Sequence, residues 1–443
     1  MDKNEIFNNV DNFSAEQLFD FINKGIITLD ELRDTGELDA TKRKAIITLQ
    51  KKIEQEDDNA WNNFRYTESG CRTYLEAYPF GRHVEDAQQQ IDDLQRQREQ
   101  EIADRQKNLD KIRKNPNSFT PGMLSGYLKN DTISRSDLID SGIPEEIIDR
   151  LDNITPPQLD LGNPPDSIPD GYTEVYFWGL PGSGKTCALA AVLSTANKMG
   201  YLEIAQGEGQ NYMVKLKNIF SDRISFLPGP SPVDTTQYLP FTLKKRNEKY
   251  YRSVSLIELS GEIFECFLFK NGKKPLPSPQ HEKTFNNLIQ LLNGKNRKIH
   301  FFFVDYDKEN KVDADGYRQS DYLEAAATYF NNGRNNLFNK TTDAIYIVLT
   351  KSDLMDCDKS DQINQISRYL QNNNFSSFVN SLRSKCEENS INGGRILATP
   401  FALGNVYFQQ MCIFEDETSR NIIDILMRRI PQKKQSILDV FNK

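Results

Sequence analysis

A glycine-rich segment near the middle of the chain has the residue types and spacing of a phosphate-binding loop. Its residues are Gly179, Leu180, Pro181, Gly182, Ser183, Gly184, Lys185 and Thr186. The segment satisfies the pattern GxxxxGK[ST], and it lies between an apolar run and a helical pattern, as that pattern requires. Gly182 and Gly184 would let backbone N–H groups surround a β-phosphate at a helix N-terminus, where the helix dipole favours an anion. Lys185 would bridge the β- and γ-phosphates, and the Thr186 hydroxyl would bind Mg²⁺.

Several predicted strands around this loop end in polar residues. Residues 174–178 form a buried strand before the loop, and residues 238–243 and 252–258 predict an antiparallel hairpin that ends in the sequence ELSGE, from Glu258 to Glu262. Three further apolar runs follow. They are KIHFFFVDYD, which ends at Asp305 and Asp307, AIYIVL, which ends in Thr350, Lys351, Ser352 and Asp353, and RILAT, which leads into Pro400, Phe401, Ala402, Leu403 and Gly404.

The order of these motifs resembles the translation-factor-related class of P-loop GTPases. In that class a strand and P-loop precede a hairpin ending in DxxG, a strand, a strand ending in [NT]KxD and a last strand before a base-contacting loop. The resemblance covers residues 173–430, and LIELSGE is most similar to bacterial double-GTPase relatives encoded near conflict and defence genes. It implies a doubly wound α/β P-loop NTPase fold, a mostly parallel sheet with one antiparallel strand, and GTP and Mg²⁺ as ligands.

The resemblance assigns guanine recognition to the TKxD segment and to the last loop. Asp353 would accept hydrogen bonds from the guanine N1–H and 2-amino group, a donor pair that adenine lacks. The stem of Lys351 would lie along the base plane, and Thr350 opens the segment. Guanine O6 would meet a backbone N–H of Phe401, Ala402 or Leu403.

The resemblance also assigns metal binding and hydrolysis. Glu258 stands where the class carries Asp and would hold Mg²⁺ through a water, although its longer side chain changes that geometry. Lys185 and the Gly261 N–H would act on the γ-phosphate, and Glu262 occupies the position of the Gln that orients the attacking water. Because a carboxylate at that position also repels the γ-phosphate, we expect slow or partner-stimulated hydrolysis. Thr235 and Thr236 are candidates for the Mg²⁺-binding switch threonine; the alternative is an ordinary proline-rich surface turn.

Two alternative hypotheses about the activity of the chain stay open. In the first, KIHFFFVDYD is a Walker B strand with Asp305 on Mg²⁺ and Thr350 as a sensor, which suits an ATPase of the wider superfamily that binds ATP. In the second, the chain is a nucleotide-binding scaffold that hydrolyses poorly and works through its helical part. Binding of ATP but not of GTP would favour the ATPase hypothesis over the GTPase hypothesis. Measured release of phosphate would distinguish an enzyme from the scaffold.

The N-terminal third predicts an all-α arm that contains an internal repeat. At an offset of 106 residues, a hairpin of short capped helices within residues 1–50 matches another within residues 116–152. Between them, residues 51–115 predict a long polar helix after a unit similar to the helix-turn-helix units of tetratricopeptide-like proteins. Residues 153–172 form a proline-rich linker, and residues 173–443 form the GTPase domain. The arm predicts a protein partner; the alternative is a helical domain that only packs on its neighbour.

Charge and composition restrict the classes of partner. Residues 1–170 carry a net charge of about −13 and residues 171–443 about +5, so broad binding of nucleic acid by the acidic part is not expected. Six scattered cysteines and three histidines show no metal-binding spacing. We group Cys187 with the nucleotide loop; small packing is the favoured interpretation of its side chain, and a pKa lowered by the helix N-terminus is the alternative. We expect a cytoplasmic protein without membrane contact, and a nucleotide-dependent dimer stays an open alternative.

Overall fold

The computed structural model describes residues 2–36, 38–152, 157, 159, 168–207, 209–229, 236–331, 337–371 and 373–434. The chain divides into two compact units, residues 1–110 and residues 111–443, which we describe separately. Among the described residues, no helix is both long enough and apolar enough to cross a membrane. Thr235 lies outside the described residues, as do residues 153–156, 158 and 160–167 of the predicted linker.

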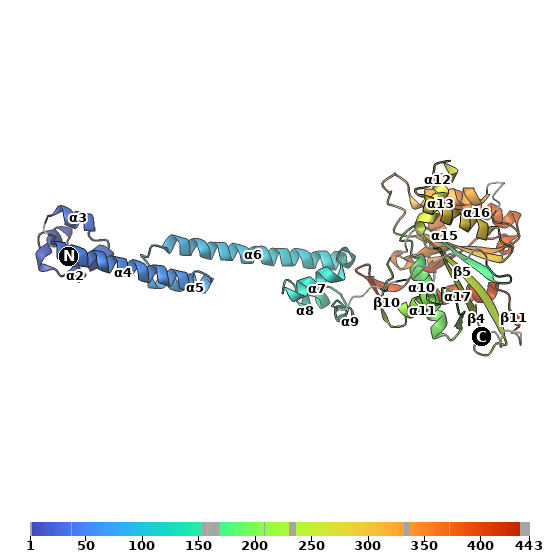
Figure 1. Cartoon of the computed structure of the whole chain (residues 1–443), viewed down its shortest axis with the longest axis horizontal. Coiled ribbons are helices and arrows are strands. Elements are labelled where there is room, and N and C mark those ends of the chain that lie inside the picture. Colours follow the sequence, from blue (N-terminus) through green and yellow to red (C-terminus); the bar gives the residue numbers. More distant parts are fainter. Residues whose placement is uncertain are drawn as a thin grey trace. The chain divides into compact units, whose positions relative to one another are not determined.

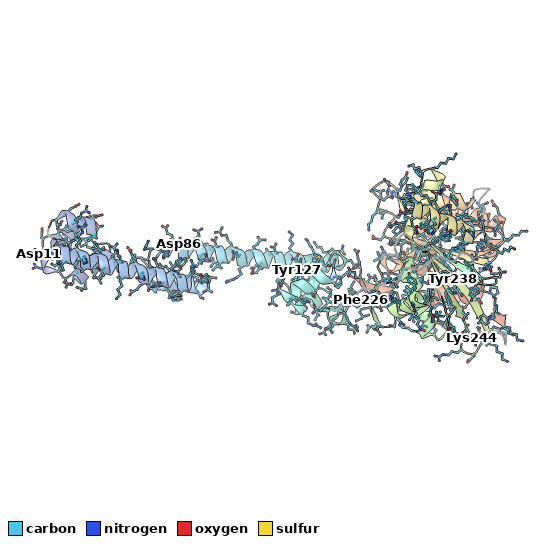
Figure 2. All side chains as sticks on the ribbon, in the orientation of Figure 1. Asp11, Asp86, Tyr127, Phe226, Tyr238 and Lys244 are labelled. Carbon is cyan, nitrogen blue, oxygen red and sulfur yellow. The ribbon has the colours of Figure 1, made fainter. Side chains whose placement is uncertain are left out.

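The first unit is helical. It comprises α1 (Lys3–Phe7), a 3-10 turn η1 (Val10–Asn12), α2 (Ala15–Asn23), α3 (Leu29–Asp34), α4 (Ala40–Phe64), α5 (Glu68–Ala77) and most of α6 (Val84–Lys114). Ser14 caps α2 and Thr28 caps α3, each in a capping box. α4 continues through residue 50, where the sequence predicts a module boundary. Side chains project from the 31-residue α6 on all sides (Figure 2), in keeping with its polar sequence.

A buried polar cluster joins α4, α5 and the turn before α6. The Tyr74 hydroxyl donates to Asp57 Oδ1 at 2.5 Å, and the Arg82 backbone N–H donates to Asp57 Oδ2 at 2.7 Å. Gly81 lies so close to Tyr74 and Asp57 that a Cβ there would overlap both side chains. The turn is therefore tightly braced, and it presents Phe80, which is 90% exposed.

The second unit begins with the second copy of the helical repeat. After η2 (Pro116–Ser118) come α7 (Pro121–Lys129), α8 (Arg135–Asp140) and α9 (Glu145–Ile148). Thr120 caps α7 and Ser134 caps α8, at the positions equivalent to Ser14 and Thr28 of the first copy. Both copies are thus pairs of short helices with matched caps.

In the described part of the chain, eight strands form a mostly parallel sheet. Their order is β2-β4-β5-β1-β6-β7-β8, and β11 pairs with β5. The strands are β1 (Thr173–Trp178), β2 (Leu202–Ile204), β4 (Thr236–Leu243), β5 (Tyr250–Leu259), β6 (Arg297–Asp305), β7 (Thr342–Thr350), β8 (Leu397–Phe401) and β11 (Lys433–Lys434). The predicted hairpin is confirmed, because β4 pairs antiparallel with β5. Instead of one antiparallel strand, both β4 and the two-residue β11 run antiparallel to β5.

Helices cover both faces of this sheet (Figure 1), because successive side chains of a buried strand point to opposite faces. Val175 and Phe177 of β1 belong to one core, while Tyr176 and Trp178 belong to the other. The first core contains α10 (Lys185–Lys198), α11 (Gln210–Ile219) and α17 (Glu417–Arg429). The second contains α12 (Gly261–Asn271), α13 (Pro279–Leu292), α14 (Gln319–Asn331), α15 (Gln362–Leu370), α16 (Asn373–Glu388) and η4 (Ile391–Gly393).

A small three-stranded sheet lies beside the main one, in the order β3-β10-β9. It consists of β3 (Ile224–Phe226), β9 (Gly404–Tyr407) and β10 (Met411–Phe414). The fold is therefore a mixed α/β unit with a mostly parallel sheet, preceded by a helical N-terminal region. The carboxyl ends of β1, β5, β6, β7 and β8 meet at one edge, where the polar residues predicted from the sequence come together.

Candidate functional site

The glycine-rich loop (residues 179–186) leaves the carboxyl end of β1 and leads into α10. Gly182 and Gly184 have φ angles of 73° and 87°, in the left-handed region where a side chain is strained. Gly184 is also the N-cap of α10, and as a glycine it has no side chain with which to cap the helix. The N–H groups of the first turn and the helix dipole make such a helix N-terminus a favourable position for an anion.

Lys185 lies inside the loop with only 7% of its surface exposed. Its ammonium group donates to the carbonyl oxygens of Gly179 at 2.7 Å and of Leu180 at 2.8 Å. Burial lowers the pKa of Lys185 to about 7, and the nearby Glu258 carboxylate opposes that shift. A buried ammonium held mainly by carbonyls gains strongly from an added negative charge, which a phosphate would supply.

Glu258, at the end of β5, is the acid that lies against the loop. It is 1% exposed, and its Oε1 accepts a hydrogen bond from Thr186 Oγ1 at 2.5 Å. Its Oε2 accepts a hydrogen bond from the Tyr212 hydroxyl at 2.5 Å. Tyr212 belongs to α11, which precedes the hairpin. The predicted pair of Thr186 and Glu258 is thus in direct contact, and Tyr212 is a partner that sequence reasoning missed.

Gly261, the first residue of α12, touches the other side of the same loop. A Cβ built on Gly261 would overlap the Pro181 nitrogen and would lie 2.5 Å from the Leu180 carbonyl carbon. Only glycine allows this approach, since no side chain atom fits between the two backbones. The Gly261 backbone is therefore placed at the corner of the loop formed by Leu180 and Pro181.

Glu262 follows Gly261 but leans toward the start of α13. Its Oε2 lies 3.6 Å from His281 Nε2, and His281 Nδ1 lies 2.8 Å from the Ser278 hydroxyl. The predicted water-positioning carboxylate therefore has an imidazole neighbour that the sequence alone does not reveal, because His281 is distant in the chain and carries no motif.

Asp305, at the end of β6, has different partners from Glu258. Its Oδ2 forms an ion pair with Lys351 Nζ at 2.9 Å, and its Oδ1 accepts from the Asp307 N–H at 3.0 Å. The Thr350 hydroxyl donates to the carbonyl oxygens of Ser183 at 3.0 Å and of Val304 at 3.2 Å. Thr350 thus ties β7 to β6 and to the glycine-rich loop, and the Lys351 ammonium is held toward Asp305.

A second lysine, Lys308, also reaches the loop and was not predicted. It lies in the turn after β6, and its Nζ donates to the Pro181 carbonyl oxygen at 2.8 Å. Burial lowers its pKa, while Asp305 and Glu265 oppose that shift. Burial raises the pKa of Glu265 in α12, and the positive charge of Lys308 counters it. Neither residue belongs to a motif, so no local pattern in the sequence could have identified them.

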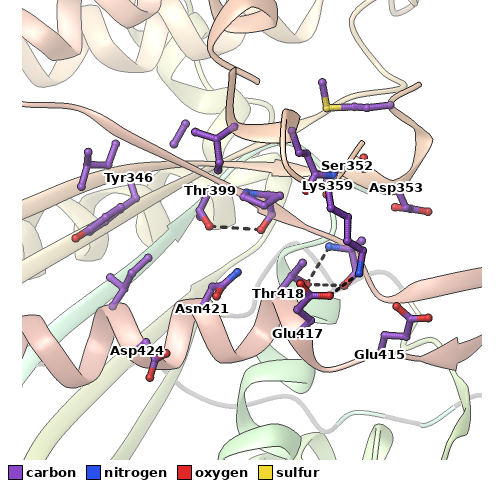
Figure 3. Close-up of a pocket in the computed structure, with 18 of the residues that line it drawn as sticks. Tyr346, Ser352, Asp353, Lys359, Thr399, Glu415, Glu417, Thr418, Asn421 and Asp424 are labelled. Atoms are coloured by element: carbon purple, nitrogen blue, oxygen red, sulfur yellow. Dashed lines mark hydrogen bonds and ion pairs between the residues drawn. The ribbon is translucent and has the colours of Figure 1, made fainter. Parts of the chain in front are cut away.

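A groove of about 880 Å³ lies along the edge strand β8 and contains part of the predicted base-binding set. Figure 3 shows Ser352 and Asp353 at one end and Thr418, Asn421 and Asp424 along α17. Partial desolvation raises the pKa of the Asp353 carboxyl group, although the residue as a whole is exposed. Asp353 follows the 3-10 turn residue Ser352 of η3 (Ser352–Leu354), after Lys351 in a left-handed conformation with φ of 55°.

The loop after β8 is more constrained than the sequence suggests. Ala402 lines the groove, but its N–H donates to Thr418 Oγ1 at 3.1 Å, and the same hydroxyl donates back to the Ala402 carbonyl oxygen at 2.7 Å. Leu403 is buried, and its carbonyl oxygen accepts from the Glu415 N–H at 3.0 Å. A base contact through Ala402 would therefore have to replace an existing hydrogen bond.

The structure also bears on Cys187, Thr235 and Thr236, which were predicted to lie at the nucleotide or the metal ion. The favoured interpretation of Cys187, small packing, agrees with the structure, because burial and the nearby Glu258 carboxylate together raise its pKa to about 12 rather than lowering it. Cys187 packs against the first core. Thr235 lies outside the described residues, and Thr236 opens β4 opposite Leu259 with its side chain undescribed.

Within the described ranges, no three His, Cys, Asp or Glu side chains converge as a ready-made metal site. Thr186 Oγ1 and Glu258 Oε1 are 2.5 Å apart at the loop, and hydroxyl and carboxylate oxygens are ligand types that Mg²⁺ accepts. Neither a protein-family model nor a curated protein matches this chain.

Proposed function

We propose that this chain is a P-loop GTPase of the translation-factor-related class, which binds GTP with Mg²⁺ and hydrolyses it slowly. The observation that carries the proposal is the hydrogen bond between Thr186, at the start of α10, and Glu258, at the end of β5. These residues lie far apart in the sequence, yet they meet at the predicted metal position. The order β4-β5-β1-β6-β7-β8 also supports it, since β5, the hairpin strand that carries Glu258, lies directly beside β1, the strand that leads into the glycine-rich loop.

The residues at the loop supply the functions that a triphosphate needs. The loop N–H groups and Lys185 would bind the β- and γ-phosphates, and the Gly261 N–H would approach the γ-phosphate from the corner at Pro181. Thr186 and Glu258 would hold Mg²⁺, which neutralises phosphate charge when bound. Glu258 rather than Asp305 fits this role, because Asp305 is engaged by Lys351 while Glu258 contacts Thr186.

The helical region gives the switch a means of reaching a partner. We propose that nucleotide-dependent changes near Gly261 are transmitted to a protein bound by the arm, in a bacterial conflict or defence process. The braced turn is a candidate contact, because the exposed Phe80 ring offers an apolar anchor that a partner could bury and the backbone that carries it is already held. Nucleotide-dependent pull-down by the full chain, compared with a Phe80→Ala variant, tests this part of the proposal.

Asp353→Ala tests the base assignment. We expect labelled GTP to bind the wild-type protein much more tightly than ATP, and the variant to lose about 10- to 100-fold in GTP affinity while weak ATP binding changes little. The reason is that a carboxylate facing guanine accepts two N–H donors. Asp356→Ala, an exposed neighbour in the same loop, is the matched control. Tighter binding of ATP than of GTP by wild-type protein would instead favour the ATPase reading.

Tyr212→Phe tests the metal assignment. The substitution removes one hydrogen bond to Glu258, so we expect the Mg²⁺ concentration required for half-maximal GTP binding to rise about three- to tenfold. GTP-binding titrations over a range of Mg²⁺ concentrations measure the Mg²⁺ requirement. Tyr238→Phe is the control, since it removes a tyrosine hydroxyl from β4, the strand beside the one that carries Glu258. An unchanged Mg²⁺ dependence would remove Tyr212 from the metal site.

Hydrolysis separates the enzyme from the non-hydrolysing scaffold. The scaffold reading draws support from Glu262, whose carboxylate lies near His281 rather than being held against the loop. Single-turnover phosphate release by the full chain, with and without a captured partner, decides between the two. Tight GTP binding without release in either condition identifies a scaffold.

A further inference from the structure

We propose that Lys308 is a second phosphate-binding lysine, which contacts the γ-phosphate of a bound nucleoside triphosphate from within the same chain. This inference rests on the proposed function and extends it to a residue that no motif marks. It predicts that Lys308 distinguishes triphosphate from diphosphate and supports the transfer of the γ-phosphoryl group to water.

The position of Lys308 relative to the loop is the main argument. Its Nζ lies 2.8 Å from the Pro181 carbonyl oxygen, and Gly261 packs against the nitrogen of the same proline. Lys308 and Gly261 therefore share one corner of the loop, whereas Lys185 lies within the loop on the carbonyls of Gly179 and Leu180. A phosphate that contacts the Gly261 N–H would come within reach of Lys308.

The turn that carries Lys308 is held in place. The Lys308 N–H donates to the Asp305 carbonyl oxygen at 3.2 Å, and the Asp307 N–H donates to Asp305 Oδ1 at 3.0 Å. Lys351 pairs with Asp305 Oδ2 at 2.9 Å and so fixes the carboxylate that organises the turn. Buried Asp305 therefore has a structural role apart from metal binding, because its carboxylate positions the turn that carries Lys308.

The charges around Lys308 indicate an ammonium that can exchange partners. Asp305, Glu265 and Asp313 attract it, Lys351 repels it, and burial lowers its pKa. Lys308 in turn contributes to the lowered pKa of Lys185. Two partly desolvated cations beside one loop repel each other, and a triphosphate bound between them would relieve that repulsion. Exchanging one neutral carbonyl for phosphate oxygens gives Lys308 a stronger, charge-assisted hydrogen bond.

The chemical role follows from the hydrolysis step. When water attacks, its oxygen bonds to the γ-phosphorus, the bond from that phosphorus to the β–γ bridging oxygen breaks, and a proton of the water passes to solvent or phosphate. Negative charge accumulates on the bridging and γ-phosphate oxygens of the leaving diphosphate and the transferred group. An ammonium at the Pro181 corner would stabilise that charge without taking part in bond formation.

The experiment compares Lys308→Met with Lys308→Arg and with Lys311→Met in the full chain. Lys311 lies in the same turn, pairs with Asp307 at 2.7 Å and is the matched control. We expect Lys308→Met to lose about 10- to 100-fold in GTP affinity, to keep GDP affinity within about threefold, and to slow single-turnover hydrolysis at least tenfold. Lys308→Arg should recover most of both losses, and Lys311→Met should behave as wild type.

Equal losses of GTP and GDP affinity in Lys308→Met, or no loss of either, would overturn the proposal. A measurement on unmodified protein covers the case in which the variant does not fold: GTPγS should protect Lys308, more than GDP does, from an amine-reactive reagent detected by mass spectrometry, with Lys311 as internal reference. Equal protection by both nucleotides contradicts a γ-phosphate contact. Wild-type protein that binds neither nucleotide overturns the proposed function itself, a result distinct from either outcome for Lys308.

Discussion

Replacing Lys185 by methionine is expected to lower the affinity for a nucleoside triphosphate by at least roughly 100-fold. The ammonium is buried in the loop and is held on the carbonyl oxygens of Gly179 and Leu180. In the complex, charged phosphate oxygens would replace these neutral acceptors. The substitution should therefore destabilise the nucleotide complex more than the free protein. Methionine keeps the aliphatic stem, which limits the packing change. Fluorescence titration with a labelled GTP analogue measures the effect.

The control for Lys185→Met is Lys198→Met at the opposite end of α10, where the lysine is exposed. Thermal melts of both variants verify that the fold persists. Affinity within threefold of wild type for a folded Lys185→Met protein would mean that the glycine-rich loop does not bind phosphate. The proposed function would then have to be abandoned rather than adjusted.

Gly261→Ala is expected to have the second large effect. The new methyl group would overlap the Pro181 nitrogen and lie 2.5 Å from the Leu180 carbonyl carbon, so α12 or the loop must move. Forced packing of this kind costs about 1–3 kcal/mol of unfolding free energy. For a unit of this size that corresponds to a fall in melting temperature of about 1–5 °C. Because the Gly261 N–H would also move away from the γ-phosphate, the preference for GTP over GDP should fall.

Gly272→Ala at the end of α12 is the matched control for Gly261→Ala. Gly272 has a φ of −75°, and the nearest atom to an added Cβ is the Leu268 carbonyl oxygen at 3.5 Å, an ordinary contact. The unfolding free energy of the Gly272→Ala protein should stay within about 1 kcal/mol of that of the wild type. A Gly261→Ala protein that melts and binds nucleotides like Gly272→Ala would show that the close approach to the loop is unimportant.

Glu258 and Asp305 illustrate how the structure separates two acids that look alike in the sequence. Each ends a buried strand, and the apolar run before Asp305 is the better formal match to a Walker B strand. In the fold, Glu258 accepts hydrogen bonds from Thr186 and Tyr212, while Asp305 pairs with Lys351 and organises the turn before Lys308. The difference depends on which strand lies beside the loop and on which side chains face it.

The strands and the loop could be predicted because their signals are local. An apolar run, a glycine-rich octapeptide and a helical pattern specify β1, the loop and α10, since the left-handed φ angles of Gly182 and Gly184 depend on their own residue type. The hairpin of β4 and β5 was likewise visible, because its two strands are separated by a short charged turn. The paired caps of the repeated helices follow from Ser and Thr at matched positions.

Other parts of the site could not be predicted from the sequence. The sequence left two interpretations of Cys187 open, because it showed a helix N-terminus but not the burial that raises the pKa of the thiol. Ala402 was predicted to offer its N–H to a base, whereas Thr418, on a helix that follows it in the chain, already accepts that hydrogen bond. In both cases the outcome depended on neighbours supplied by another element.

The sequence by itself therefore determined the strand pattern, the glycine-rich loop and the residues at the strand ends. Only the tertiary structure decided that Tyr212 supports Glu258, that Gly261 touches Pro181 and that Lys308 reaches the same corner. The physical reason is that torsional preference and hydrophobic period act between residues near in the chain. Hydrogen bonds, desolvation and charge act between groups near in space, and the packing of strands and helices brings those groups together.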